Sequence, residues 1–101
     1  MRHVLLTFLL LHSVWTLAQN TGTIRGTVRD EYGNTLPRAS VTIAGTSTGV
    51  ACDDQGRYSI DVPANEAFVL RWSYSGIPPF EERITVTEGQ LLIRDVKLNV
   101  T

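Results

Sequence analysis

The chain has 101 residues, enough for one small domain, and an ordinary composition: 43% hydrophobic, 19% charged, with a formal net charge of −1. These values exclude an intrinsically disordered chain and argue against a nucleic-acid-binding protein, which would carry an excess of Lys and Arg. A single cysteine excludes a scaffold held by disulfides.

The first 18 residues predict a signal peptide for export. A basic start precedes the apolar run VLLTFLLL, and the segment ends in Thr16-Leu17-Ala18 ahead of polar residues. These are the three regions of a secretory leader. The alternative is a membrane anchor, but the uncharged stretch from Val4 to Ala18 has 15 residues, fewer than the roughly 20 that a spanning helix needs. We expect cleavage after Ala18 or Gln19 and no membrane span afterwards.

Removing the leader changes the chemistry that the chain can perform. Both histidines, His3 and His12, lie in the leader, so the mature chain lacks the commonest general base. Cys52 is the one cysteine, and we expect it to be a small buried residue of a strand rather than a nucleophile. The sequence therefore predicts a protein that is not an enzyme, with no catalytic residues and no cofactor.

The remaining residues predict β-strands, because apolar and polar residues alternate and no segment keeps helical spacing. Turn residues separate these stretches about every 10 residues, which is typical of a β-sandwich or small barrel. We predict an all-β fold, a seven-stranded antiparallel β-sandwich over residues 22–100. The expected core positions are Ile24, Val28, Ala39, Val41, Ile43, Tyr58, Ile60, Val62, Phe68, Leu70, Trp72, Tyr74, Ile84, Val86, Val96, Leu98 and Val100.

Two places interrupt this alternation. Pro78-Pro79 is expected to end the long strand that begins at Ala67, which would make Ile77 to Phe80 a rigid loop. Arg94 breaks the last pattern if Leu92 points inward, so we expect a bulge or a later strand start there.

Glycines and aspartates mark the turns between the predicted strands. Carboxylates at turn starts accept backbone N–H bonds, and glycines supply positive φ. Gly26 instead lies inside a strand, where the missing side chain permits a close backbone approach. The residues expected to define the turns are Asp30, Gly33, Gly45, Gly49, Asp53 and Gly56.

The ordered motifs resemble the carboxypeptidase regulatory-like domain, whose fold is a prealbumin-like (transthyretin-like) β-sandwich. The resemblance begins with Ile24-x-Gly26-x-Val28-x-Asp30-x-x-Gly33 and continues through Asp53-x-x-Gly56-x-Tyr58-x-Ile60-x-Val62-Pro63. With a leader in front, the chain is most similar to the N-terminal extension of SusC-like TonB-dependent outer-membrane transporters. Cys52 departs from the family, which usually has Thr there.

The resemblance implies an exported, non-catalytic module, structural or interactive, in the periplasm or at the outer membrane of a Gram-negative bacterium. Its expected partners are envelope proteins, a TonB-dependent transporter or its surface lipoprotein among them. The chain is too short to form a transporter barrel itself. Edge strands of an open sandwich, or the segment from Ile77 to Phe80, are candidate contact surfaces.

Binding of a glycan is the alternative function. Tyr32 and Phe80 are the aromatics expected in loops, and we take them as candidate contacts for a ligand or a partner. Trp72 and Tyr74 alternate in phase with core residues and are expected inside. The acidic pairs Asp30-Glu31 and Asp53-Asp54 suit turn capping better than calcium, so no metal site is predicted.

Overall fold

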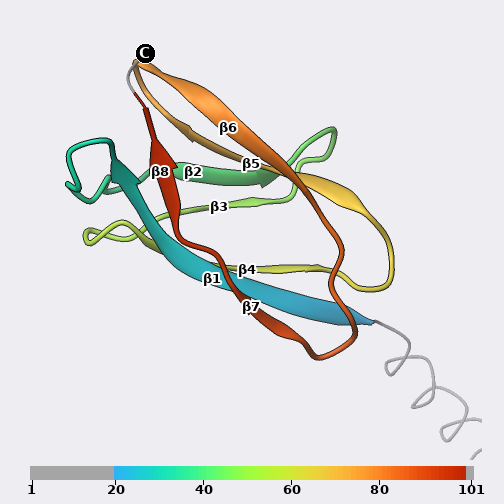
Figure 1. Ribbon diagram of the computed structural model, residues 1–101. Helices are drawn as coiled ribbons and strands as arrows, with labels where there is room; N and C mark the ends of the chain where they lie inside the picture. The colour runs from blue at the N-terminus through green and yellow to red at the C-terminus, as the bar shows by residue number, and fades with distance from the viewer. Residues whose placement is uncertain (1–19, 100–101) are drawn as a thin grey trace, which may run out of the picture.

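The computed structural model describes residues 20–99, so the predicted signal peptide and its cleavage site lie outside the described residues. Residues 20–99 form two four-stranded sheets that face each other as a sandwich (Figure 1), which confirms the predicted all-β fold. These residues contain no helix that is long and apolar enough to span a membrane. The strands are β1 (Thr21–Asp30), β2 (Ser40–Ile43), β3 (Gly49–Ala51), β4 (Arg57–Pro63), β5 (Phe68–Tyr74), β6 (Ile77–Ile84), β7 (Leu91–Ile93) and β8 (Val96–Leu98).

The core between the sheets is formed by the inward residues of each strand. In β4 the burial alternates strictly, with Tyr58, Ile60 and Val62 buried and the residues between them exposed. Such alternation places one apolar face toward the opposite sheet. Trp72 of β5 is fully buried and contacts the rings of Tyr58 and Phe80. The other fully buried large side chains are Ile24, Leu70, Leu98, Val28, Val41, Val62 and Val86.

The first sheet is organised around β1. The strand order is β4–β1–β7, and β8 also pairs with β1, while the second sheet has the order β3–β2–β5–β6. β4 is antiparallel to β1, but β7 and β8 are parallel to it. The predicted β-sandwich is confirmed with two differences in detail: residues 20–99 contain eight strands rather than seven, because the last strand is interrupted, and two pairings are parallel.

β7 and β8 are two halves of one interrupted strand. Arg25 lies opposite Ile93 in β7, and Val28 lies opposite Val96 in β8, so the register with β1 is the same on both sides of the break. The break falls at Arg94 and Asp95, where the sequence pattern predicts an interruption. Because no residue is inserted, this is a later strand start and not a bulge.

Gly26 is the position in β1 where the interrupted strand comes closest. A Cβ atom at Gly26 would overlap the carbonyl group of Arg94, so no residue with a side chain fits there without a shift of the backbone. The Arg94 N–H donates to the Arg25 carbonyl at 2.6 Å, and the Tyr58 hydroxyl donates to the Arg94 carbonyl at 2.6 Å. Tyr58 lies directly opposite Gly26 in the pairing of β1 with β4. Because Gly26 has no side chain, the Tyr58 hydroxyl can extend past it to the Arg94 carbonyl. The close approach predicted at Gly26 is confirmed.

An ion pair joins the two sheets beside this contact. Arg94 donates from Nε and Nη2 to the two carboxylate oxygens of Glu82 in β6, with 2.6 Å between Nε and Oε1. Glu82 lies opposite the buried Leu70, so its side chain starts from the inner face of the second sheet. Arg94 and Glu82 thus point inward at the same open side of the sandwich. They form a bidentate ion pair, the geometry that arginine and carboxylate favour.

The segment with Pro78 and Pro79 is a strand and not the predicted loop. β6 runs from Ile77 to Ile84 and pairs with β5 at the edge of the second sheet. Prolines are tolerated in an edge strand, because the absent N–H does not have to bond a second neighbour. The turn that starts this strand contains Gly76, whose φ is +82°.

Gly49 also differs from the expectation. Gly33, Gly45 and Gly56 have positive φ, between 74° and 86°, but Gly49 does not and is the first residue of β3. A Cβ at Gly49 would lie 2.7 Å from the Thr42 methyl carbon and 3.0 Å from the Val41 carbonyl. Close packing on β2, and not turn geometry, therefore requires glycine there.

The Gly26 contact leads to a stability prediction. We expect Gly26→Ala to lower the free energy of unfolding by about 3 kcal/mol or more, because the added methyl group meets backbone atoms that other bonds hold in place. Gly33→Ala, where only positive φ opposes the side chain and no atom lies within 4 Å, should cost about 1 kcal/mol. Urea unfolding followed by circular dichroism measures both, and equal losses would contradict the proposed role of Gly26.

Candidate functional site

Cys52 is buried, as the sequence predicts, with 4% of its surface exposed. Burial, and to a lesser extent the neighbouring Asp53 carboxylate, raises the pKa of its thiol to about 11. The reactive form of a cysteine is the thiolate, so this thiol is suited to packing and not to nucleophilic chemistry at ordinary pH.

Asp30 and Asp53 organise two turns at the same end of the first sheet. The Oδ1 atom of Asp30 accepts the N–H groups of Tyr32 and Asn34, both at 2.9 Å. Oδ1 of Asp53 accepts those of Gln55 and Arg57, also both at 2.9 Å. Partial burial opposes ionisation of Asp30, but the N–H bonds outweigh it and leave its pKa below the ordinary value of 3.8. The N–H bond from Arg57 is the main reason that the pKa of Asp53 is also lowered.

These carboxylates are turn caps in the structure. Among residues 20–99, no group of three or more Asp, Glu, Cys or His lies together in a way that suits a metal ion.

The two aromatics predicted to contact a ligand lie on different elements. Tyr32 is 78% exposed in the turn after β1. Phe80 is 41% exposed but belongs to β6, and its ring packs at a tilt on Trp72 with 5.7 Å between ring centroids. Phe80 lines a small hollow of about 180 Å³ together with Pro78, Pro79, Lys97, Leu98 and Asn99, and Tyr32 is not part of its wall.

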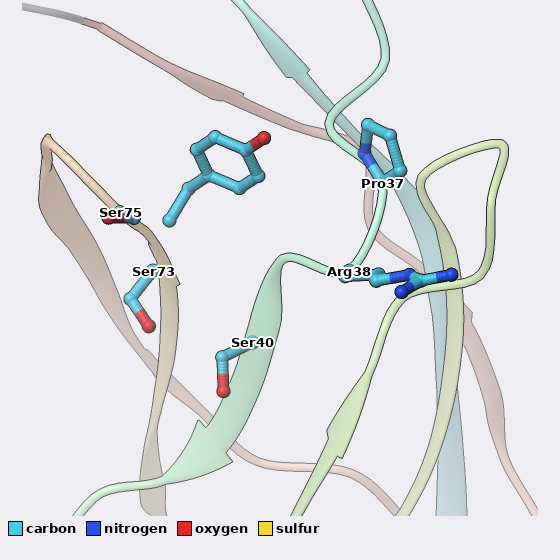
Figure 2. A pocket seen from close by; sticks show the side chains of 6 residues that line it. Pro37, Arg38, Ser40, Ser73 and Ser75 are labelled. Carbon is cyan, nitrogen blue, oxygen red and sulfur yellow. The ribbon is translucent and has the colours of Figure 1, made fainter.

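A larger hollow lies between the start of β2 and the end of β5. Figure 2 shows Ser73 and Ser75 on one side, Pro37 and Arg38 on the other, and Ser40 between them. Tyr74 also lines this open hollow of about 550 Å³, which we call the β2–β5 hollow. Ser40 and Ser73 lie directly opposite each other in the pairing of the two strands, so rigid sheet positions hold both hydroxyls.

Tyr74 was expected in the core, and the structure places it at the margin of the core. The register of β5 with β6 shifts between Trp72 and Tyr74, and the extra residue lies in β6, because Trp72 pairs with Phe80 and Tyr74 pairs with Ile77. β5 therefore keeps its alternation. Tyr74, the last residue of β5, packs against the core on one side but is only half-buried, and it lines the β2–β5 hollow.

Arg38 is held in an unusual backbone conformation at the rim of this hollow. Its φ is +64°, in the left-handed region that residues with side chains rarely adopt. The segment is fixed to the turn between β3 and β4, because the Arg38 N–H donates to the Asp53 carbonyl at 3.4 Å and its guanidinium to the Asp54 carboxylate, also at 3.4 Å. Arg38 is the third residue of a turn that the Ala39 N–H closes by donating to the Leu36 carbonyl at 3.3 Å, and a proline followed by a residue of positive φ is typical of a type II turn. Sequence reasoning did not name this turn, although Pro37 is its local signal.

β7 presents a second kind of surface. Leu91 is 52% exposed and Ile93 is 60% exposed, on the outer face of the first sheet. The Gln90 carbonyl accepts the Thr23 N–H, and the Arg94 N–H donates to the Arg25 carbonyl. Backbone groups alternate in direction along a strand, so those of Leu91 and Ile93 point away from β1. Within the described residues β7 pairs only with β1, so this edge is open.

The comparisons identify the family. The chain belongs to the carboxypeptidase regulatory-like domain family, whose model matches residues 23–99. TonB-dependent receptor P3 of Formosa agariphila is 31% identical over 100 residues, which make up 98% of this chain and 10% of the receptor. The chain thus spans about a tenth of the length of that relative.

Solved structures share the fold at low sequence identity. Catechol 1,2-dioxygenase of Acinetobacter sp. ADP1 has a TM-score of 0.63 at 13% identity, covering 81% of this chain and 53% of the enzyme. The TIE protein of Bacillus anthracis has a TM-score of 0.60 at 19% identity, covering 79% of this chain and 17% of that protein. At these identities the likeness extends to the fold alone.

The turn carboxylates lead to a pH prediction. Because the folded-state pKa values of Asp30 and Asp53 are lowered, their stabilisation is present above the ordinary value of 3.8 and is lost as the pH falls through the lowered values. In the variant with Asp30→Asn and Asp53→Asn, the amide oxygens still accept N–H bonds but do not titrate. We expect urea midpoints of this variant to depend less on pH below about 4. An unchanged pH dependence would contradict this role.

Arg38 leads to a third prediction. We expect Arg38→Gly to raise the free energy of unfolding by about 0.5 kcal/mol, because relief of the left-handed strain exceeds the entropy cost of glycine in the unfolded chain. The lost ion pair with Asp54 is exposed and contributes little. Arg38→Ala is the matched control: it removes the same ion pair but keeps the strain and should not gain. Equal stabilities of the two variants would refute the strain.

Proposed function

We propose that this chain is an exported, non-catalytic module of the bacterial cell envelope that serves as an accessory domain of a SusC-like TonB-dependent transporter. Its partner is the transporter or the surface lipoprotein of that transporter. The leader predicted at residues 1–18 supports export, and the likeness to a segment of a TonB-dependent receptor supports the transporter context.

The open edge of β7 is the observation that carries a role in protein contact. Natural sheets usually shield their edges with charges, prolines or covering segments, because unpaired N–H and C=O groups attract other strands. β6 follows this rule with Pro78 and Pro79, whereas β7 combines outward backbone groups with exposed Leu91 and Ile93. An extended strand of a partner would satisfy the backbone groups and bury the two apolar side chains.

The positive charge of Arg25 near this edge further limits which residues a partner strand can carry. Arg25 of β1 lies opposite Ile93 on the same outer face and is exposed. Within the described residues, the Arg25 side chain donates a hydrogen bond from Nε to the Ser59 hydroxyl at 3.4 Å. Because this partner is neutral, the charge of Arg25 remains available to a partner strand. A partner strand with apolar residues and an acidic residue would therefore fit this edge best.

Site-specific photo-crosslinking in the source bacterium tests the proposal. The full chain with its own leader carries the crosslinker at Leu91, or at Ser59 on the exposed face of β4 as the matched control. We expect a crosslinked product only from position 91, in the envelope fraction, with a transporter or its lipoprotein as the partner found by mass spectrometry. Introducing Ile93→Lys should reduce this product about tenfold or more.

Three results would refute the proposed function. They are retention of the chain in the cytoplasmic fraction, equal products from positions 91 and 59, and a partner from outside the envelope. Circular dichroism of Ile93→Lys shows whether the fold is kept, which is expected because this side chain is exposed.

A further inference from the structure

The open edge of β7 has a continuation in β8, because both strands follow β1 in one register (Figure 1). In β1 the Val28 N–H donates to the Gly56 carbonyl, and the Val28 carbonyl accepts the Leu36 N–H. Backbone groups alternate along a strand, so those of Arg29 point to the other side, where β8 lies. Those of Lys97, the partner of Arg29 in the parallel register, then point away from β1. The open backbone edge therefore extends from β7 to β8.

β6 of the second sheet comes near this edge without pairing with it. Within residues 20–99, β8 pairs with β1 and with no other strand. Between β6 and β8 lies the hollow of about 180 Å³ whose wall includes the partly exposed ring of Phe80 and the side chain of Leu98. A strand added beside β8 would direct every second side chain toward the second sheet. An apolar side chain of that strand can therefore enter the hollow.

The outer face beside β8 carries positive charge that a partner can neutralise. Arg29 and Lys97 are neighbours in the pairing of β1 with β8, and both are exposed. Among the ion pairs formed within residues 20–99, none includes either of them. Asp95 lines a shallow hollow with both, but it already accepts the Thr27 N–H at 2.9 Å. Two like charges on neighbouring strands repel each other, so an acidic side chain on an added strand would be favourable here.

We propose that the partner strand at the β7 edge continues past the break and pairs with β8, with an acidic residue beside Lys97. This inference rests on the proposed function, since it extends the same contact and specifies the sequence of the partner. Side chains on one face of a strand are two residues apart, so the acidic residue should lie about four positions from the apolar residue beside Ile93. The partner segment is thus extended, about nine residues long, apolar toward β7 and acidic toward β8.

An anionic lipid surface is the other occupant that these side chains could attract. Lipid headgroups would pair with Arg29 and Lys97, and acyl chains would contact Leu91 and Ile93. A lipid surface would nevertheless leave the outward N–H and carbonyl groups of both strands without a matching strand. The backbone geometry therefore favours an extended protein segment.

Photo-crosslinking from Asn99 tests the continuation, in the same full chain and bacterium as the crosslinker at Leu91. Asn99 is exposed and lines the hollow beside β8. We expect both positions to attach to one segment of one envelope protein. Mass spectrometry should place the two attachment points about eight residues apart, with an acidic residue between them. Ala51, exposed in the edge strand β3 of the second sheet, is the matched control and should give no such product.

Charge reversal tests the acidic residue of the partner. Lys97→Glu should lower the product from position 99 about threefold or more, because it places like charges side by side. Arg83→Glu makes the same change of charge at an exposed position of β6 and should leave the product unchanged. Exchange of the mapped acidic residue of the partner for lysine should restore the product of Lys97→Glu. Both positions are exposed, so the fold should be kept, which circular dichroism checks.

The outcomes separate this inference from the proposed function. A transporter or lipoprotein product from position 91 with none from position 99 would refute the continuation and leave the proposed function intact. The absence of an envelope partner at both positions would refute both. Attachment of position 99 to a phospholipid, to another protein or to a distant segment would overturn the inference. Equal effects of Lys97→Glu and Arg83→Glu would also overturn it, because the charge beside β8 would then have no specific partner.

Discussion

The contact between Gly26 and the Arg94 carbonyl is the constraint on which the rest of the sandwich depends. A missing side chain in the central strand lets the final strand approach, and Arg94 then bonds Arg25 through its N–H and Tyr58 through its carbonyl. The Thr27 N–H donates to Asp95 at 2.9 Å in the same place. Because all these groups bond within one short stretch, the break between β7 and β8 leaves few backbone groups unpaired, and both halves keep one register with β1.

The same break places charge where the two sheets would otherwise meet through apolar residues. Glu82 occupies an inward position of the edge strand β6, Arg94 lies in the break between β7 and β8, and their ion pair lies at one open side of the sandwich. An ion pair thus joins the two sheets at that side, and the apolar side chains of Trp72, Tyr58 and their neighbours fill the interior. The candidate functional surface is the exposed edge of β7 and its continuation along β8. It requires no reactive group, which is consistent with the buried, poorly ionised Cys52.

Much of the fold could be predicted, because strict alternation and turn residues act locally. The burial of Ile24, Val41, Trp72 and Leu98 and the close approach at Gly26 follow from side-chain period and from the absence of a Cβ. The candidate sites could not be predicted in the same way. Tyr74 has the period of a core residue and packs against the core, but it is the last residue of β5, and its other side lines the β2–β5 hollow. Which segments cover the end of a strand is decided by other elements, not by the period of that strand. Pro78 and Pro79 likewise end a strand only if it lies inside a sheet, and β6 lies at an edge.

The sequence by itself determined the class of this protein: an all-β chain of the carboxypeptidase regulatory-like family, with strands and core residues dictated by local alternation. It also determined the chemistry that is missing, since the described residues contain no histidine and one buried cysteine. Only the tertiary structure decided which strands lie at edges, that two of them run parallel to β1, and that Arg38, Ser40, Ser73 and Tyr74 line one hollow. The β2–β5 pairing joins residues 27 to 33 positions apart, the parallel pairings join residues 68 positions apart, and hydrophobic period carries no information about such pairs.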